Sequence, residues 1–307
     1  MKRREPFSNE SLHRDSTMFQ GLIVEHLTSW LTINPYKGCP LACAYCFRAR
    51  WHPSDVPEQT QDVAEAVEAL IRHPNFRANE TPVSINNSST DPLLPAVKPS
   101  TFKAIGLLDS KHLRNPFAII SKLELKPKDV EFLQELRFVR PIMFVSLSLM
   151  PKNIEPAPIP PRLRTLRRIS LSRIPCVLYF RPIVKDLNDS PEVISTVLRI
   201  GARYCDAICI GSLRVSPEIR TQMTIRGVQI DNYEDDFHRK LFLNDIEDRI
   251  LGIYDQMKLS VPLFKHSSCA VSYLLTSANY NFLFNNPEKN CVRTCPASQQ
   301  NLCRPQE

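Results

Sequence analysis

The chain is poor in glycine and has no long apolar run. Only 7 of its 307 residues are glycine, whereas 26 are proline. So few glycines argue against a glycine-rich dinucleotide-binding fold, and the prolines predict many fixed turns. No apolar run reaches the roughly 20 residues that a membrane-spanning helix needs, and the polar start does not resemble a secretory signal. We therefore expect a cytoplasmic protein that does not act at a membrane.

The charge balance is basic. The formal net charge is +7, from 39 Lys and Arg against 32 Asp and Glu. This balance suits an anionic partner such as a nucleic acid or a phosphorylated substrate. The densest basic run lies in 162–173, where Arg164, Arg167 and Arg168 share one face of an expected helix. That face can meet phosphates, or it can simply be solvated.

Short apolar segments alternate with amphipathic ones along most of the chain. The expected strands are 30–34, 82–86, 117–120, 142–146, 177–180 and 207–210, and the expected helices between them are 60–73, 100–108, 128–136, 161–169 and 191–202. Strands that are apolar throughout and separated by helices are parallel and buried on both faces. The pattern predicts an α/β fold, a partial (β/α)6 barrel of the TIM type, with its chemistry at the carboxyl ends of the strands.

We expect three regions in the chain. An N-terminal extension covers 1–28, the partial barrel covers 29–232, and a C-terminal extension that carries cysteines covers 233–307. The extension is expected to begin with a helix at 235–257 and to contain one more strand at 261–264.

The first group of cysteines directly follows the first expected strand. Cys39, Cys43 and Cys46 are separated by three and by two residues. Cysteine thiolates hold iron–sulfur clusters, usually one per iron, so three of them leave one iron of a 4Fe-4S cluster open. The alternatives are a zinc knot and three unrelated thiols, but zinc usually takes four ligands in paired short spacings.

Several stretches together resemble one family. The cysteine motif resembles that of the radical S-adenosylmethionine (SAM) enzymes. The stretches 34–38, 90–95, 121–122, 155–164 and 181–189 are similar to the spore photoproduct lyase-like branch, often labelled DNA repair photolyase-like. The resemblance covers about 30–215. It implies a partial barrel of the radical SAM type that binds SAM and a 4Fe-4S cluster.

The resemblance also implies residues that contact SAM. Tyr45 is expected beside the adenine, and Thr90, Lys122 and Ser146 at the amino-acid end or the ribose of SAM. An ammonium group suits a carboxylate, and hydroxyls suit ribose or carboxylate oxygens. The alternatives are that Tyr45 only packs and that Lys122 is a solvated lysine. Arg181 ends a strand on the expected catalytic side, so we expect it to contact SAM or the substrate.

One position departs from the family pattern. In the true photoproduct lyases a cysteine that donates hydrogen stands just before the Thr/Ser-Asp pair, and this chain has Ser88 there. A serine hydroxyl is a much poorer donor of hydrogen atoms than a thiol. Reversal of thymine dimers by the lyase route is therefore not expected.

A second group of cysteines lies near the C-terminus. Cys269, Cys291, Cys295 and Cys303 can close a second, fully ligated 4Fe-4S cluster. The alternatives are a four-cysteine zinc site, a site in which His266 replaces Cys269, and thiols that bind nothing. Three further cysteines, Cys176, Cys205 and Cys209, are interpreted as structural.

The leading hypothesis for function is a radical SAM enzyme of lyase or oxidoreductase type. It would cleave SAM reductively to a 5′-deoxyadenosyl radical, which abstracts hydrogen from a small-molecule, nucleotide or peptide substrate. The electron donor would be a flavodoxin or a ferredoxin. The alternatives are repair or modification of nucleic-acid bases and, outside enzymes, a zinc-stabilised protein that binds nucleic acid without catalysis.

Overall fold

A mostly parallel sheet forms the centre of the molecule. The computed structural model describes residues 22–25, 29–50, 54–230 and 244–304. Within them eight strands form one sheet in the order β1-β2-β5-β6-β7-β8-β9-β10. Their bounds are β1 Ile23–Glu25, β2 Leu31–Ile33, β5 Val83–Ile85, β6 Pro116–Ser121, β7 Arg140–Ser146, β8 Cys176–Ile183, β9 Ala207–Ser212 and β10 Leu263–Phe264. Only β1 is antiparallel to its neighbour.

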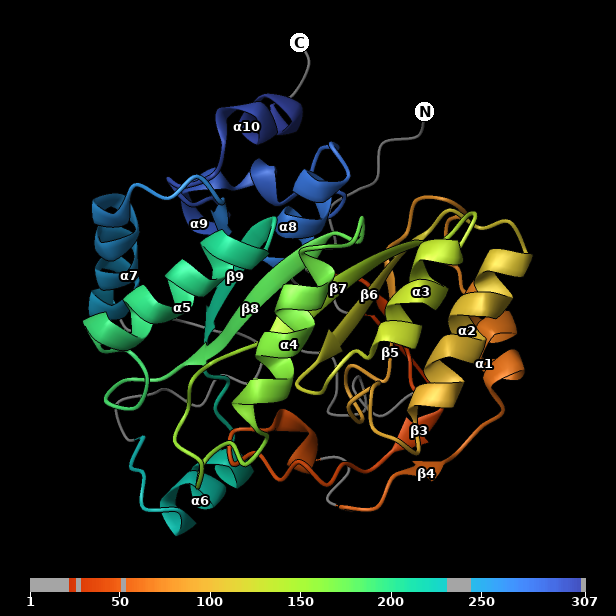
Figure 1. Ribbon diagram of the computed structural model, residues 1–307, viewed down its shortest axis with the longest axis horizontal. Helices are drawn as coiled ribbons and strands as arrows, with labels where there is room; N and C mark the ends of the chain where they lie inside the picture. The colour runs from red at the N-terminus through yellow and green to blue at the C-terminus, as the bar shows by residue number, and fades with distance from the viewer. Residues whose placement is uncertain (1–21, 26–28, 51–53, 231–243, 305–307) are drawn as a thin grey trace.

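Helices between consecutive strands cover the outer face of the sheet (Figure 1). They are α1 Val63–Ile71, α2 Lys98–Ser110, α3 Pro127–Glu135, α4 Ile159–Ile169 and α5 Pro191–Tyr204, and α7 Asn244–Met257 packs beside α5. Apolar side chains of the strands and of these helices form one large core. Each fully buried aliphatic side chain contributes about 1.5–3 kcal/mol, so this face supplies most of the stability.

The C-terminal part of the chain covers the inner face of the sheet. It contains α8 Ser267–Leu274, the short 3₁₀ helix η4 Leu283–Asn285, α9 Pro287–Asn290 and α10 Ala297–Cys303. Inward-facing residues of the strands, among them Phe144, Val177 and Cys209, form a second core with Ala270 and Val271 of α8. In Figure 1 this region lies at the top, whereas α6 Pro217–Ile225 lies at the bottom, beyond the carboxyl ends of the strands.

The observed elements confirm the expected alternation. The six expected strands appear as β2 and β5 to β9, and the strand expected at 261–264 appears as β10. The helix expected at 235–257 is present as α7 from Asn244, and 235–243 lie outside the described residues. The partial barrel of the TIM type is therefore confirmed, whereas the boundaries between the three regions stay predictions.

Other elements were not expected from the sequence. In the sheet region these are β1, α6 and a two-stranded hairpin of β3 Tyr36–Lys37 and β4 Glu58–Gln59, with the 3₁₀ helix η3 Phe47–Arg50 between its strands. In the C-terminal part they are α8, η4, α9 and α10. No helix in the described ranges is long and apolar enough to cross a membrane.

Candidate functional site

The first cysteine loop follows β2 at the carboxyl edge of the sheet and is held by the β3–β4 hairpin. The amide of Cys39 donates to the carbonyl of Ser54 over 3.1 Å. The buried Arg48 donates from Nη2 to the carbonyl of Cys39 (3.0 Å) and from Nη1 to that of Ser54 (3.2 Å). Gly38 has φ +88°, and a Cβ atom there would lie 2.0 Å from the carbonyl oxygen of Val56. The loop can approach the hairpin this closely because residue 38 is glycine.

The three thiols of this loop lie within electrostatic range of one another. Burial raises the pKa of Cys43 to about 12, the ammonium of Lys122 opposes this rise, and Cys46 and Cys39 add to it. Burial also raises the pKa of Cys39. Without metal both thiols hold their protons at neutral pH, so a metal that binds here must displace protons.

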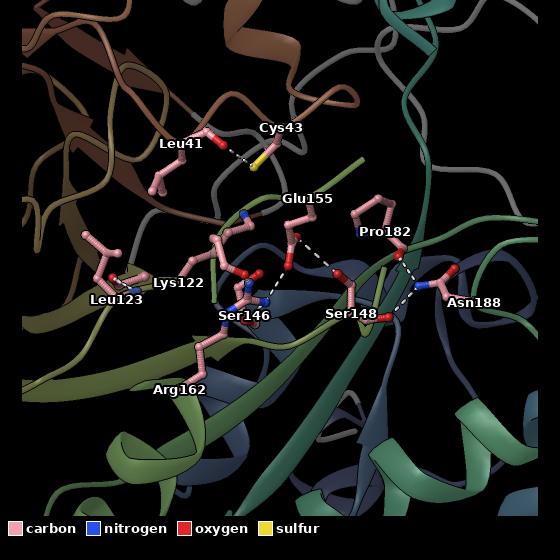
Figure 2. Close-up of polar contacts among 12 residues, drawn as sticks. Leu41, Cys43, Lys122, Leu123, Ser146, Ser148, Glu155, Arg162, Pro182 and Asn188 are labelled. Atoms are coloured by element: carbon pink, nitrogen blue, oxygen red, sulfur yellow. Dashed lines mark hydrogen bonds and ion pairs between the residues drawn. The ribbon is translucent and has the colours of Figure 1, made fainter. Parts of the chain in front are cut away.

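The side chains expected to contact SAM gather beside this loop. Figure 2 shows the sulfur of Cys43 pointing toward the ammonium of Lys122, which stands 5.6 Å from the centroid of the Tyr45 ring. The hydroxyls of Tyr45 and Thr90 are buried and have no hydrogen-bond partner among the described residues. Buried polar atoms are nearly always paired, so these two are open to a ligand or to water.

Asp91, next to Thr90, is a positioning residue whose role is not apparent from the sequence. Its Oδ1 accepts from the Ser121 hydroxyl (2.7 Å) and the Leu93 amide (2.9 Å), and its Oδ2 accepts from the Lys122 amide (2.9 Å). Burial raises the pKa of Asp91, and these hydrogen bonds oppose the rise. The carboxylate ties the loop after β5 to the end of β6 and so orients Lys122.

A buried ion pair supports the end of β7. Arg162 is fully buried, donates to Glu155 and Ala157, and donates over 3.2 Å to the carbonyl of Ser146. The other oxygen of Glu155 accepts from the Ser148 hydroxyl over 3.1 Å. Figure 2 shows this network below Cys43. Arg162 therefore does not belong to a solvated basic face, and Ser146 is fixed through its main chain.

The same segment supports the cysteine loop. The amide of Ala44 donates to the carbonyl of Ile154 over 2.9 Å, and both side chains are buried in a small apolar cluster with Leu213 and Ile219. The position of the cysteine loop thus depends on the loop after β7. Nothing local in the cysteine motif signals this dependence.

The donors of Arg181 are used within the sheet. Nε donates to the carbonyl of Ile210 (2.8 Å), Nη1 to the hydroxyl of Tyr179 (3.1 Å) and Nη2 to the carbonyl of Lys265. A Cβ atom at Gly211 would lie 2.4 Å from Nε of Arg181, so that glycine leaves room for the guanidinium. Arg181 ties β8 and β9 to the segment after β10, and its contact with SAM or substrate stays a prediction.

Ser88 is also engaged in the scaffold. It is buried, and its hydroxyl donates to Oδ1 of Asn34 over 3.1 Å, as does the hydroxyl of Ser89. The amide of Asn86 donates to the carbonyl of Ile33 over 2.8 Å. These bonds join the loops that follow β2 and β5.

The structure brings the C-terminal cysteines together near the inner face of the sheet. Burial raises the pKa of Cys269, and the charges of Cys209 and of the other three thiols add to this rise. Burial likewise raises the pKa of Cys295 to about 11, and the charges of Cys291 and Cys303 contribute. Burial and Cys303 also raise the pKa of Cys291. In the described parts of the chain no three His, Cys, Asp or Glu side chains converge on one metal ion. The metal assignments at both cysteine groups therefore stay predictions.

The other cysteines have the surroundings expected of structural residues. Cys176 and Cys209 are buried in the sheet. The sulfurs of Cys176 and Cys205 lie 3.6 Å apart.

The basic run on α4 is partly neutralised. Arg164 donates to Oε2 of Glu124 from Nε (3.1 Å) and Nη2 (2.6 Å), and Arg168 reaches Oε1 over 3.3 Å and also the carbonyl of Leu125. Two of the three arginines on the expected phosphate-binding face thus share one carboxylate. The nucleic-acid partner stays a prediction.

Comparison with solved structures identifies the fold. The chain is similar to a spore photoproduct lyase variant with dinucleoside spore photoproduct, with a TM-score of 0.54, 14% identity and 72% of each chain covered. It is also similar to SuiB of Streptococcus suis bound to SAM, with a TM-score of 0.51 and 11% identity over 82% of this chain and 52% of SuiB. Both are radical SAM enzymes, so the chain has the fold of that superfamily, as the sequence motifs predicted.

Curated sequences give a weaker match. The uncharacterised proteins Mb2609c of Mycobacterium bovis and Rv2578c of Mycobacterium tuberculosis are each 25% identical over 216 residues, which is 62% of this chain. The match spans 60% of the length of these relatives. No family model matches the chain.

Proposed function

We propose that the protein is a radical SAM enzyme that abstracts hydrogen from a small-molecule, nucleotide or peptide substrate. The observation that carries the proposal is the cysteine loop. Three thiols within electrostatic range of one another stand at the carboxyl edge of a radical SAM-type barrel, with the ammonium of Lys122 beside Cys43. This edge is where barrels of parallel strands bind ligands.

The residues at this edge fit an iron–sulfur cluster and its cosubstrate. Cys39, Cys43 and Cys46 would hold a 4Fe-4S cluster, one thiolate per iron. When bound, such a cluster would supply the electron that cleaves SAM to methionine and a 5′-deoxyadenosyl radical. The three sulfur ligands are soft donors, which suit iron–sulfur clusters, and each thiol releases its proton when it binds metal.

The chain itself would bind and orient SAM. The ammonium of Lys122 suits the carboxylate of SAM, and it also offsets negative charge at Cys43. The unpaired hydroxyls of Tyr45 and Thr90 can each donate one hydrogen bond to a bound molecule. Asp91 accepts a hydrogen bond from the main-chain amide of Lys122 and so fixes the backbone position from which the Lys122 side chain extends.

The position of Ser88 favours a reaction other than repair of thymine dimers. A buried hydroxyl that donates to Asn34 over 3.1 Å serves the scaffold. No thiol replaces it at this position in the sequence. We therefore favour radical modification of another substrate over base repair by the lyase route.

The test is anaerobic purification followed by reduction with dithionite in the presence of SAM. We expect about four irons at this site and release of 5′-deoxyadenosine, measured by liquid chromatography with mass spectrometry. Replacing Cys39, Cys43 or Cys46 by Ala should abolish this product, because each thiolate holds one iron. The matched control is Cys205→Ala, which removes a cysteine that belongs to neither group.

Two results would contradict the proposal. One is full production of 5′-deoxyadenosine by any of the three loop variants. The other is a protein that takes up zinc and no iron or sulfide under anaerobic reconstitution. Deuterated candidate substrates, followed by transfer of deuterium into 5′-deoxyadenosine, would then identify the substrate class.

A further inference from the structure

Two buried amide side chains donate hydrogen bonds to cysteine sulfurs in the C-terminal region. Nδ2 of Asn279 donates to Sγ of Cys269 over 3.4 Å, and the Asn279 main-chain amide donates to Sγ of Cys303 over 3.4 Å. Nε2 of Gln299 donates to Sγ of Cys303 over 3.3 Å. Both amide residues are almost fully buried, at 2% and 3% exposure.

Each of the two side-chain nitrogens also donates to an oxygen: Nδ2 of Asn279 to the Ser268 hydroxyl over 3.1 Å, and Nε2 of Gln299 to the Ser277 carbonyl over 3.0 Å. An amide NH₂ group has two hydrogens, so each nitrogen can still direct a donor at a sulfur, which is an unusual acceptor for a buried amide. A neutral thiol is only a weak acceptor, and buried N–H groups normally pair with oxygen. A thiolate carries negative charge, and hydrogen bonds to charged acceptors are about twice as strong as neutral ones. Three N–H donors directed at two sulfurs therefore suit cysteines that are deprotonated, as metal ligands are.

The surroundings contain a further open donor. The hydroxyl of Tyr280 is buried, has no hydrogen-bond partner in the described ranges and lies within electrostatic range of Cys269. Cys291 and Cys295 lie within the same range of Cys269 and Cys303. Four thiols and several polar donors thus surround one region of an otherwise apolar interface.

We propose that Cys269, Cys291, Cys295 and Cys303 ligate a 4Fe-4S cluster and that Asn279 and Gln299 are its positioning residues, whose N–H···S bonds raise its reduction potential. Each thiolate binds a different iron, so the four sulfurs need not converge on one point as ligands of a single zinc ion must. An N–H···S bond is stronger when the cluster is reduced and more negative. Its loss therefore disfavours the reduced state.

This centre is separate from the first cysteine loop. The C-terminal region enters the sheet at β10, which pairs with Ile208 and Cys209 near the start of β9, whereas the first loop lies at the carboxyl ends of the strands. In Figure 1 the two regions lie at opposite ends of the view. The proposal therefore stands whether or not the first loop cleaves SAM, and the two can be tested apart.

The test uses the full chain in which Cys39, Cys43 and Cys46 are all replaced by Ala. After anaerobic reconstitution it should retain about four irons and four sulfides, the content of one cubane. The midpoint potential is then measured by a redox titration followed by electron paramagnetic resonance. Gln299→Met in this background removes the donor to Cys303, together with the donor to the Ser277 carbonyl, without adding charge. We expect about a tenfold loss of reduced cluster at a fixed potential, a fall of about 59 mV for a one-electron couple.

A neighbouring glutamine provides the control. Nε2 of Gln300, on the same helix, donates to the carbonyl oxygen of Cys295 over 2.8 Å and not to a sulfur, so Gln300→Met should leave the potential unchanged. A second variant, Asn279→Asp, keeps the Oδ1 acceptor of Asn281 and Leu283 but loses the donor to Cys269. It should also lower the potential.

Several outcomes would overturn the proposal. The cluster assignment fails if the triple variant holds no iron, or one zinc, while its circular dichroism matches that of the unchanged protein. The role of Gln299 fails if Gln299→Met and Gln300→Met have the same potential. Loss of iron from Gln299→Met but not from Gln300→Met, with unchanged circular dichroism, supports the role of Gln299 as a positioning residue. Production of 5′-deoxyadenosine by the unchanged protein is measured separately and reports only on the first loop.

Discussion

The substitution Gly38→Ala tests how the chain positions the first cysteine loop. Gly38 has φ +88°, and an added Cβ would stand 2.0 Å from the carbonyl oxygen of Val56, far inside van der Waals contact. The left-handed backbone alone costs an alanine about 1–2 kcal/mol. Relief of the overlap adds roughly 1–3 kcal/mol, the usual cost of overpacking. The hairpin and the Cys39 amide must move apart to make room.

Gly227 is the matched control for this substitution. It has φ +79°, and no atom lies within 4 Å of an added Cβ. Gly227→Ala therefore carries the backbone cost of about 1–2 kcal/mol without the overlap. The difference between the two variants isolates the contact between the cysteine loop and the hairpin.

The assay combines urea unfolding with iron analysis after anaerobic reconstitution. Gly38→Ala should lose roughly 2–5 kcal/mol of unfolding free energy and most of the iron bound by the first loop. Gly227→Ala should lose less stability and keep its iron. Equal stability and equal iron content in the two variants would refute the reasoning, because the contact with Val56 would then have no effect on the loop.

Three further predictions concern charged residues around the site. Glu155→Ala leaves the buried guanidinium of Arg162 without its partner and should lower the free energy of unfolding in urea by about 3–5 kcal/mol. The double variant Glu155→Ala with Arg162→Met should recover much of that loss, and an equal loss in the single and the double variant would contradict this prediction. Lys122→Met should raise the dissociation constant of SAM about tenfold, or about 1.4 kcal/mol, in equilibrium dialysis, and unchanged binding would show that the ammonium does not contact SAM. The hydrogen bond from Arg164 lowers the pKa of Glu124, so its contribution is present above the unfolded pKa of about 4.3 and is lost as the pH falls through the lower folded value. Glu124→Gln should therefore make the acid limb of the stability curve shallower by roughly 0.5 kcal/mol or less, because Arg164 is half exposed, and an unchanged limb would argue against the pair.

The pattern of apolar residues within short segments was sufficient to predict the strands of the central sheet. Apolar runs such as 117–120 and 142–146 became central strands because a segment that is apolar on both faces is stable only between two covered layers. The position of Cys39, Cys43 and Cys46 directly after the first parallel strand also followed from chain order, since loops after parallel strands lie at one edge of the sheet.

Partners that lie far apart in the chain were not visible in the sequence. Arg162 belonged to a basic run by its spacing, yet it is buried with Glu155. The sequence also did not show that the carbonyls of Ile210 and Lys265 accept hydrogen bonds from two nitrogens of Arg181. A side chain chooses its partner from whatever the fold brings near, so its sequence neighbours do not decide whether it meets solvent, ligand or main chain.

The sequence by itself determined the alternation of strands and helices and the class of the fold, and it supplied the cysteines that we expect to bind iron. These depend on periodicity and on residue chemistry, which act within a few residues of the chain. Tertiary structure alone decided that the C-terminal segment covers the inner face of the sheet and that amides at Asn279 and Gln299 face the sulfurs of Cys269 and Cys303. Such contacts depend on how distant segments pack, because burial of the inner face selects one docking arrangement that no local pattern specifies.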